Sequence, residues 1–449
     1  MGSNRSDILQ DLKASYHTLG CKLNFAETST VGARLKELGV RRAEAGEEPD
    51  LCVVNTCSVT EMADKKSRSL IRRLHRKYPA AGIIVTGCYA QLKPEEIRGI
   101  EGVVGVFGAN EKMKIARFVE AWISSRKWGE SSTDMTGDIG EDAKFVPSCS
   151  RGDRTRYFLK VQDGCDYFCT YCTIPYARGR SRSGAISELV RQAEEASAQG
   201  GREIVLTGVN IGDFGRNGGE NFFDLIRALD EVEGIERYRI SSIEPNLITE
   251  EIIEWVGNES RKFMPHFHIP LQSGSNTVLK LMNRRYDTEL FASRIKKIRE
   301  QMPDAFIGID IIAGARGETE EEWEKTLEYV ELLEATRFHV FPYSERPGTA
   351  ALLLGGGVEK RIRDRRAEQL IRISDRKLKA FMEKEIAKTH PILWEHEISG
   401  SGLMSGLTDN YIRVVAPFIP ELLNRVSPVV LTAIDEERAE TMQGKHKQS

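Results

Sequence analysis

Three cysteines stand close together in the stretch Gly164-Cys165-Asp166-Tyr167-Phe168-Cys169-Thr170-Tyr171-Cys172. The apolar run at 157–161, just before it, predicts a buried strand. Three thiolates on one loop can bind three irons of a 4Fe-4S cluster and leave the fourth iron without a protein ligand. A structural zinc site needs four ligands, and the nearest histidines in the sequence are His75 and His266. The spacing therefore favours an iron-sulfur cluster, and a three-cysteine catalytic zinc site is the less common alternative.

The chain around this loop alternates between short apolar runs and amphipathic segments. The apolar runs lie at 157–161, 203–207, 238–242, 267–270, 306–312 and 338–342. The amphipathic segments lie at 184–199, 222–233, 248–257, 287–301 and 318–335. Six strands joined by helical crossovers predict a partial (β/α)6 barrel.

The N-terminal part alternates in the same way. Strands are predicted at 14–19, 51–55, 82–86 and 103–107, and helices at 25–38, 61–78, 94–99 and 111–125. Such alternation predicts an open α/β domain with helices on both faces of a parallel sheet.

Three further cysteines, Cys21, Cys57 and Cys88, each follow one of these N-terminal strands. The carboxyl ends of parallel strands meet at one sheet edge, so we expect the three thiols to converge there and to bind a second cluster. A single cysteine at a strand end is usually a small buried side chain, but three at equivalent positions make that interpretation improbable. Cys52, inside a strand, and Cys149 are expected to be ordinary buried residues.

In the C-terminal part the alternation of strands and helices stops. A long helix rich in Lys and Arg is predicted at 359–388, followed by β-like runs at 394–398, 411–415 and 429–433 between Gly and Pro turns. These runs predict a small closed β-barrel of the oligonucleotide-binding style, and the tail from Glu436 is expected to be frayed. The predicted organisation is therefore an N-terminal domain at 13–128, a linker at 129–153, a barrel domain with its basic helix at 154–388, and an all-β domain at 389–449.

Composition limits the possible functions. The 449 residues are 40% hydrophobic and 29% charged, with a net charge of −3, as in ordinary globular proteins. Any nucleic-acid surface must then be a local patch. No run approaches the roughly 18 apolar residues of a membrane span, so we expect no membrane partner and a cytoplasmic protein.

The cysteine spacing at 165–172 resembles the signature of the radical S-adenosylmethionine (SAM) enzymes, in which the open iron chelates the amino and carboxylate groups of methionine. Both cysteine sets together resemble the methylthiotransferases, a branch of these enzymes with an N-terminal three-cysteine domain, a central barrel and a C-terminal barrel called TRAM. The resemblance is carried by Gly20-Cys21-Lys22-Leu23-Asn24 with Glu27, Asn55-Thr56-Cys57, Gly87-Cys88, the stretch 164–172, Pro270-Leu271-Gln272-Ser273-Gly274-Ser275, and Tyr343-Ser344 with Arg346-Pro347-Gly348-Thr349.

The resemblance implies a radical reaction that uses two 4Fe-4S clusters and two SAM molecules. It implies that one SAM methylates sulfur carried at the Cys21, Cys57 and Cys88 cluster. The other SAM is cleaved at the Cys165, Cys169 and Cys172 cluster, so that a 5'-deoxyadenosyl radical removes hydrogen from an unactivated carbon, where methylthio is attached. An inert carbon leaves little work for acid–base residues, which agrees with the absence of a conspicuous His or carboxylate dyad in the sequence. The residues implied in SAM binding are Tyr171, Thr207, Gly208, Asn210, Ser242, Glu244, Gln272 and Ser273.

Within the family, substrates are an adenosine beside the tRNA anticodon that carries isopentenyl or threonylcarbamoyl, or an aspartate of a ribosomal protein. The run 170–183 looks most like the threonylcarbamoyladenosine branch, which implies methylthiolation of C2 of N6-threonylcarbamoyladenosine in a tRNA anticodon stem-loop. An electron donor such as flavodoxin or ferredoxin and a monomeric state are also expected. A non-catalytic two-cluster electron carrier is the alternative from another functional class.

Candidate RNA contacts complete the predictions. Two helices carry basic runs, namely Lys65, Lys66, Arg68, Arg72, Arg73, Arg76 and Lys77 on one, and Arg361, Arg363, Arg365 and Arg366 on the other. A charge run is usually a solvated helix face, but an appended barrel favours RNA, to which Tyr411 and Arg413 could contribute. The sequence departs from the family pattern at Gly314-Ala315-Arg316-Gly317-Glu318. Arg316 is a candidate for binding the threonylcarbamoyl carboxylate, and the alternative is an ion pair with Glu318 or Glu321.

Overall fold

The computed structural model describes residues 12–125, 133–135, 137, 144–150, 155–216 and 218–446. The chain forms two compact units. The first unit comprises Met1–Asp153, Phe158–Gly184 and Ser344–Thr349. The second unit comprises Arg154–Tyr157, Ala185–Tyr343 and Ala350–Ser449. In both units only the described residues are considered below. Most of the predicted linker at 129–153 lies outside the described residues.

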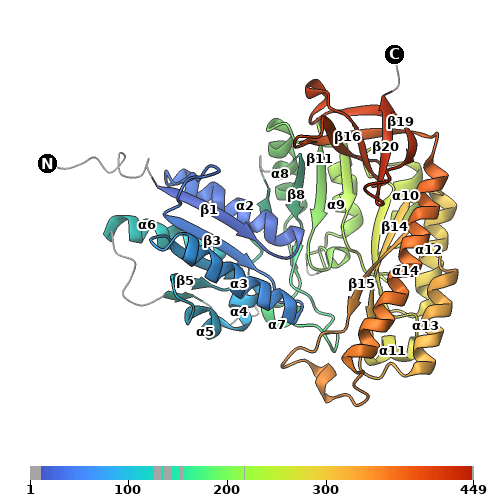
Figure 1. Cartoon of the computed structure of the whole chain (residues 1–449), viewed down its shortest axis with the longest axis horizontal. Helices are drawn as coiled ribbons and strands as arrows, with labels where there is room; N and C mark the ends of the chain where they lie inside the picture. The colour runs from blue at the N-terminus through green and yellow to red at the C-terminus, as the bar shows by residue number, and fades with distance from the viewer. Residues whose placement is uncertain are drawn as a thin grey trace. The chain divides into compact units, whose positions relative to one another are not determined.

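A parallel sheet forms the centre of the first unit, as predicted (Figure 1). Its order is β2-β1-β3-β4-β5-β6. The strands are β1 (Lys13–Thr18), β2 (Arg41–Arg42), β3 (Leu51–Thr56), β4 (Gly82–Gly87), β5 (Val103–Phe107) and β6 (Thr133–Met135). Its helices are α2 (Lys22–Glu37), α3 (Glu61–Lys77), α4 (Cys88–Leu92), α5 (Pro94–Arg98) and α6 (Ile115–Ser125).

The helices cover both faces of this sheet because its central strands are apolar on both sides. Every residue of β3 and β4 is buried. Ile83 and Val85 share a core with Leu74 of α3, whereas Ile84, which points to the other face, shares a core with Leu35 of α2. Strands buried on both faces give continuous apolar runs, which is why the sequence located them well.

The second unit contains five of the six predicted barrel strands, all parallel. They are β11 (Glu203–Thr207), β12 (Arg237–Ile240), β13 (His266–Gln272), β14 (Phe306–Ala313) and β15 (Arg337–Pro342). The first predicted barrel strand, β8 (Arg156–Lys160), begins in the second unit and continues into the first. The helices between these strands are α8 (Ile186–Ala198), α9 (Phe222–Asp230), α10 (Glu250–Asn258), α11 (Asn276–Leu281), α12 (Thr288–Gln301) and α13 (Glu320–Leu332).

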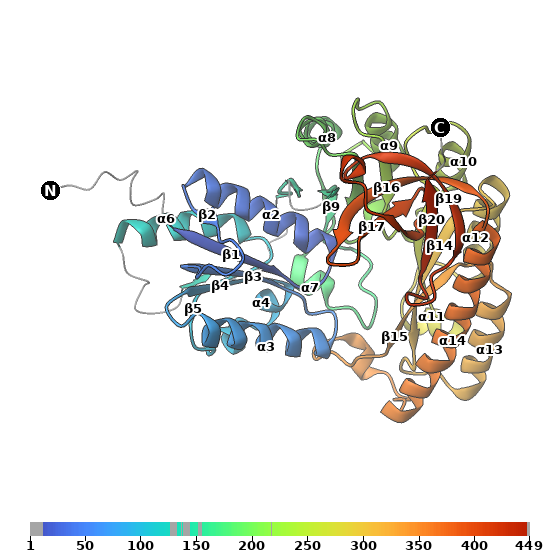
Figure 2. The same cartoon turned by 45° about the horizontal axis from the view of Figure 1, so that its top comes forward.

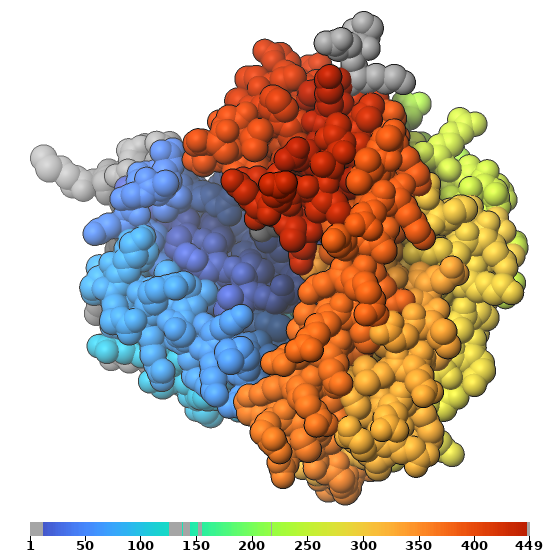
Figure 3. All heavy atoms as spheres, turned by 45° about the vertical axis from the view of Figure 1, so that its right-hand side comes forward, coloured from blue at the N-terminus to red at the C-terminus, as the bar shows by residue number. Residues whose placement is uncertain are grey.

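The C-terminal residues form a closed five-stranded barrel, as predicted (Figure 2). The strands are β16 (Thr389–Ile398), β17 (Leu403–Thr408), β18 (Arg413–Pro417), β19 (Val426–Ile434) and β20 (Thr441–His446), in the order β16-β17-β18-β20-β19. The preceding helix α14 (Lys360–Glu385) contributes Phe381 and Met382 to the barrel's core. Helix α14 ends before Ala387, whose φ of 68° is incompatible with a continuing helix. Figure 3 shows the outer side of α14, in orange, on the surface next to the red barrel.

The prediction of a frayed tail from Glu436 is wrong, because β20 closes the barrel by pairing with β18 and β19. Strand β17 was also missed. Its Gly406 lies against Trp394, where a Cβ would come within 2.9 Å of the indole. A glycine is therefore required at this buried position, and it interrupts the apolar pattern by which a buried strand is predicted.

Among the described residues, no helix is both long and apolar enough to cross a bilayer.

Candidate functional site

The structure brings the three N-terminal cysteines, hereafter the N-terminal triad (Cys21, Cys57 and Cys88), to one edge of the first unit's sheet. Cys21 is the residue before α2, Cys57 follows β3, and Cys88 begins α4. The preceding strands β1, β3 and β4 are adjacent and parallel. Their carboxyl ends therefore carry all three thiols, as the sequence predicted from strand topology.

Close backbone approach draws these loops together. Gly20 has a φ of 95°, and a Cβ there would lie 2.7 Å from Cβ of Cys57. Gly87 has a φ of 104°, and a Cβ there would lie 2.4 Å from the carbonyl oxygen of Thr56. Both contacts are too short for any side chain, so glycine is required beside two members of the triad.

The electrostatics of the triad also indicate that its thiols lie near one another. Burial raises the pKa of the Cys57 thiol to about 12, and the neighbouring Cys88 and Cys21 add to the rise. Burial likewise raises the pKa of Cys21, against the opposing effect of Arg178. Cys21 keeps solvent exposure as a residue, so the rise reflects the dense protein around its sulfur. Thiols held this way are protonated in the metal-free protein and release protons when iron binds.

The other three cysteines, hereafter the loop triad (Cys165, Cys169 and Cys172), lie between β9 (Gln162–Asp163) and α7 (Ile174–Arg178). Gly164, with a φ of 70°, packs so tightly that a Cβ would be 1.9 Å from the carbonyl oxygen of Arg180. The amide of Cys165 donates to the carbonyl of Gly179 at 3.0 Å, which closes the loop.

Backbone amides also point at the loop triad's sulfurs. The amide of Tyr167 donates to Sγ of Cys165 at 3.5 Å, and that of Ile174 donates to Sγ of Cys172 at 3.4 Å. Such N–H···S bonds stabilise thiolates and influence the potential of an iron-sulfur cluster. Both triads belong to the first unit.

Cluster sites and single-ion sites differ in how close their ligands lie to one another. Among the described residues, no three His, Cys, Asp or Glu side chains stand close enough to share one metal ion. A 4Fe-4S cluster attaches each thiolate to a different iron, so it accepts ligands more widely spread than those of zinc. Cys52 and Cys149 are buried, as predicted for ordinary core residues; the hydroxyl of Ser15 donates to the sulfur of Cys52 at 3.3 Å.

Most residues implied in SAM binding lie at or just beyond the carboxyl ends of strands in the second unit, whereas Tyr171 belongs to the first. Thr207 ends β11 and is followed by Gly208 and the buried Asn210; Ser242 and Glu244 follow β12; Gln272 ends β13 and precedes Ser273. Their SAM-binding role stays a prediction.

Glu244 and Ser273 have protein partners. Glu244 forms an ion pair with Arg284, yet burial is the larger effect and raises its pKa. The hydroxyl of Ser273 accepts a hydrogen bond from the amide of Ser275 at 3.2 Å. Gln272 has a φ of 65° beside an irregularity in the β13–β14 register, which turns the chain out of the strand.

The candidate RNA residues are largely engaged with protein. The ring of Tyr411 stacks on His266 with centroids 4.0 Å apart and lies 5.1 Å from the Arg239 guanidinium carbon. Arg413 donates to the hydroxyl of Ser405 at 3.0 Å. An RNA role for Tyr411 and Arg413 stays a prediction.

The two basic helices differ in what their charges do. On α14, Arg366 is buried and pairs with Glu318, and Arg363 donates to the carbonyl of Tyr343 at 2.7 Å. Arg316 donates to the carbonyl of Leu354 at 2.8 Å. On α3 the exposed cations are Lys65, Lys66, Arg72, Arg73, Arg76 and Lys77. Arg361 and Arg365 of α14 are exposed as well, so both helices present cations at the surface.

Sequence reasoning missed a cluster of polar side chains on the second unit's sheet. Nε2 of His268 lies 2.7 Å from Oδ1 of Asp310, and the ring of His339 is 5.0 Å from that of His268. The three residues come from β13, β14 and β15; His268 and Asp310 are partly exposed, and His339 is exposed. Asp310 is the only residue of β14 that is not buried. A single carboxylate within an apolar strand was the available signal.

Comparison with known proteins places these features in a family context. Residues 13–108 match the uncharacterized protein family UPF0004, and residues 159–330 match the radical SAM superfamily. The chain is 40% identical to threonylcarbamoyladenosine tRNA methylthiotransferase MtaB of Bacillus subtilis (strain 168), with 92% of each chain covered. It is 34% identical to MtaB of Aquifex aeolicus, covering 90% of this chain and 96% of the relative.

Other similarities are weaker. The chain is 31% identical to the tRNA-2-methylthio-N(6)-dimethylallyladenosine synthase of Acetivibrio thermocellus, with 87% of this chain and 82% of the relative covered. The structure of the radical SAM methyltransferase TsrM from Kitasatospora setae superimposes with a TM-score of 0.54 at 15% identity, over 76% of each chain. At that identity the likeness concerns the fold alone.

Proposed function

Because the chain belongs to the radical SAM methylthiotransferases related to MtaB, we propose that it attaches a methylthio group to C2 of N6-threonylcarbamoyladenosine beside the tRNA anticodon. The observation that carries this proposal is the 40% identity to an MtaB over 92% of both chains. Identity to the dimethylallyladenosine synthase is lower, at 31%. Two three-cysteine sets within one compact unit support the same chemistry.

The N-terminal triad is proposed to hold the auxiliary 4Fe-4S cluster and the loop triad the SAM-binding cluster. When bound, the clusters supply reductive cleavage of SAM and a site for the transferred sulfur. The chain's own residues hold the ligands in place: Gly20 and Gly87 let the N-terminal loops approach, and Gly164 closes the loop triad against Gly179. The SAM contacts are proposed at Tyr171, and at Thr207, Gly208, Asn210, Ser242, Glu244, Gln272 and Ser273 beyond the strand ends.

The partners follow from the reaction. Reductive cleavage requires an electron donor such as flavodoxin or ferredoxin, and the chain is proposed to act as a cytoplasmic monomer. The exposed cations of α3 are the proposed contacts to the anticodon stem-loop's phosphates. The functional division at 13–128, 154–388 and 389–449 is proposed to separate auxiliary cluster, radical chemistry and RNA binding.

Arg316 is proposed to bind the free carboxylate of the threonylcarbamoyl group. It lies just beyond the carboxyl end of β14, where β/α barrels place substrate groups. Its guanidinium can meet a carboxylate with two parallel hydrogen bonds. Arg316→Ala should discriminate less than the parent enzyme between tRNA with the free carboxylate and tRNA with that group esterified, and equal discrimination would exclude this role.

The main test supplies the anaerobically reconstituted enzyme with SAM, reductant and one of two tRNAs. One tRNA carries threonylcarbamoyladenosine and the other carries isopentenyladenosine. Nucleoside mass spectrometry should detect methylthiolation of the first only. Modification of the isopentenyl tRNA alone would overturn the substrate assignment. Reductive SAM cleavage without modification of either tRNA would support radical SAM chemistry but contradict the proposed methylthiolation of these tRNAs.

A further inference from the structure

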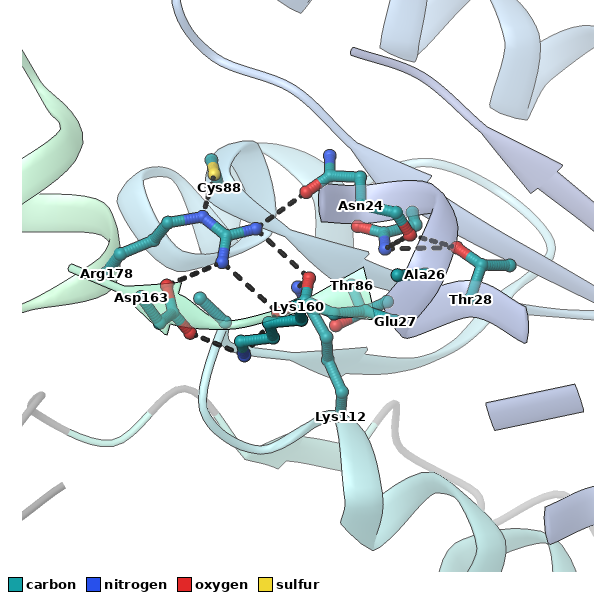
Figure 4. A network of polar contacts seen from close by, with 12 residues as sticks. Asn24, Ala26, Glu27, Thr28, Thr86, Cys88, Lys112, Lys160, Asp163 and Arg178 are labelled. Carbon is teal, nitrogen blue, oxygen red and sulfur yellow. Dashed lines mark hydrogen bonds and ion pairs between the residues drawn. The ribbon is translucent and has the colours of Figure 1, made fainter. Parts of the chain in front are cut away.

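A buried arginine joins the two cysteine-bearing parts of the first unit. Arg178 is the last residue of α7, six residues after Cys172, and its side chain is 1% exposed. Its Nε donates to Sγ of Cys88, a member of the N-terminal triad, at 3.3 Å. Figure 4 shows the guanidinium lying between Cys88 and the carboxylates of Asp163 and Glu27.

Each N–H of this guanidinium has an acceptor. One terminal nitrogen donates to Oε1 of Glu27 at 3.1 Å and to Oδ1 of Asp163 at 2.8 Å. The other donates to Oδ1 of Asn24 at 2.6 Å and to Oε2 of Glu27 at 3.0 Å. An arginine has five N–H donors in a fixed plane, so the fifth is directed at the sulfur by the four oxygens. The contact with Cys88 is thus imposed by the surrounding network.

The network around Arg178 carries a surplus of positive charge. Its buried cations are Lys112, Lys160 and Arg178, its buried carboxylates are Glu27 and Asp163, and Arg182 adds a further cation that pairs with Asp163. Burying unbalanced charge is costly unless an anion completes the set. The thiolate of a cluster-bound cysteine at Cys88, in contact with the guanidinium, would be such an anion.

We propose that Arg178 is a positioning residue that raises the reduction potential of the auxiliary cluster by donating to the sulfur of Cys88. The inference rests on the proposed assignment of that cluster to the N-terminal triad. Reduction adds one electron, and so one negative charge, to the cluster. A nearby cation and an N–H···S bond stabilise the reduced form more than the oxidised form, which moves the potential upward.

The test compares Arg178→Lys with Arg182→Lys, each made in full-length protein whose loop triad is replaced by alanine so that only the auxiliary cluster is present. Both variants exchange a guanidinium for an ammonium, but only Arg178 touches sulfur. The readout is an EPR-monitored titration with dithionite. In Arg178→Lys we expect the ratio of reduced to oxidised cluster at fixed potential to fall about tenfold, which equals about 59 mV for one electron. Arg182→Lys should move it by much less.

A second measurement on the unaltered N-terminal triad does not depend on how a variant folds. Protein labelled with ¹⁵N-arginine, with the auxiliary cluster reduced, should show coupling of a guanidinium nitrogen to the cluster in pulsed EPR. Absence of that coupling, or equal shifts in the two variants, would overturn the inference. A preparation that binds no iron at the N-terminal triad would instead contradict the proposed cluster assignment itself.

Discussion

The substitution Gly164→Ala tests whether the loop triad depends on one glycine. At a φ of 70°, alanine costs about 1–2 kcal/mol in backbone conformation. Its Cβ would also lie 1.9 Å from the carbonyl oxygen of Arg180, so the loop must move by about 1.5 Å to restore van der Waals contact. That movement breaks the hydrogen bond from the Cys165 amide to Gly179, worth about 1 kcal/mol. Overpacking adds about 1–3 kcal/mol.

The total for Gly164→Ala is therefore about 3–6 kcal/mol, concentrated at one cluster. Gly46→Ala is the matched control, because Gly46 belongs to the same unit and has a φ of 93°, but a Cβ there would meet nothing within 4 Å. We expect this control to lose only about 1–2 kcal/mol.

The assay is iron content after anaerobic reconstitution, together with thermal unfolding. Gly164→Ala should fall from about eight irons per chain toward about four, and reductive cleavage of SAM should be lost. Gly46→Ala should retain both. The reasoning fails if Gly164→Ala keeps both clusters and unfolds at the same temperature as Gly46→Ala.

Four further outcomes are expected. Replacing the loop triad by alanine should halve the iron content and abolish reductive SAM cleavage. Replacing the N-terminal triad by alanine should also halve the iron content but leave reductive SAM cleavage intact. Loss of cleavage in both variants would contradict the proposal that only the loop triad holds the SAM-binding cluster. Burial acts to lower the pKa of His390, but hydrogen bonds and ion pairs with Asp409 and Glu385 raise it from 6.5 to about 9. The contribution of protonated His390 to the free energy of unfolding is therefore complete below pH 6.5 and is lost as the pH rises to about 9. After allowance for solvent screening this amounts to about 1–2 kcal/mol, and unfolding of His390→Gln measured from pH 6 to 9.5 should lack that part of the pH dependence. Neutralising three exposed cations of α3 should reduce the salt dependence of tRNA binding by about two to three in log–log slope, and an unchanged slope would place the phosphates elsewhere. His268→Asn should lower kcat/KM for methylthiolation by about tenfold or more without lowering the melting temperature, if the His268–Asp310 pair contacts bound ligand; a loss of stability alone would make the pair structural.

The sequence predicted the elements whose physical signal is local. Strands β3 and β4 are buried on both faces, so their apolar runs locate them almost to the residue. Convergence of the N-terminal triad followed from the same rule, since parallel neighbouring strands end at one edge. Strands β17 and β20 were not predicted, because a small barrel tolerates glycine and polar residues within its strands and these interrupt the apolar pattern.

What the sequence could not give is contact between distant residues. Arg178 donates hydrogen bonds to Asn24, which is 154 residues away in the sequence, and to Cys88, which is 90 residues away. Nothing in the local sequence pattern of α7 distinguishes this arginine from one exposed to solvent. His268 and Asp310 lie 42 residues apart and meet only because β13 and β14 are neighbours. The contact between His268 and Asp310 could therefore not be read from the sequence, because the two residues are far apart along the chain.

The compact units do not follow chain order, and this bears on how the two cluster sites depend on each other. The segment Phe158–Gly184, which carries the loop triad, belongs to the same unit as the N-terminal triad. It is held there by ion pairs from Lys160 and Arg178 to both Glu27 and Asp163. Burial and the nearby Asp163 carboxylate act to raise the pKa of Glu27, but Arg178, Lys112 and Lys160 hold it well below its usual range. Removing one member of a buried ionic network leaves its partners uncompensated, which is far costlier than breaking a surface pair. Damage to the network should therefore disturb both cysteine sets together, whereas damage to either loop alone should disturb one.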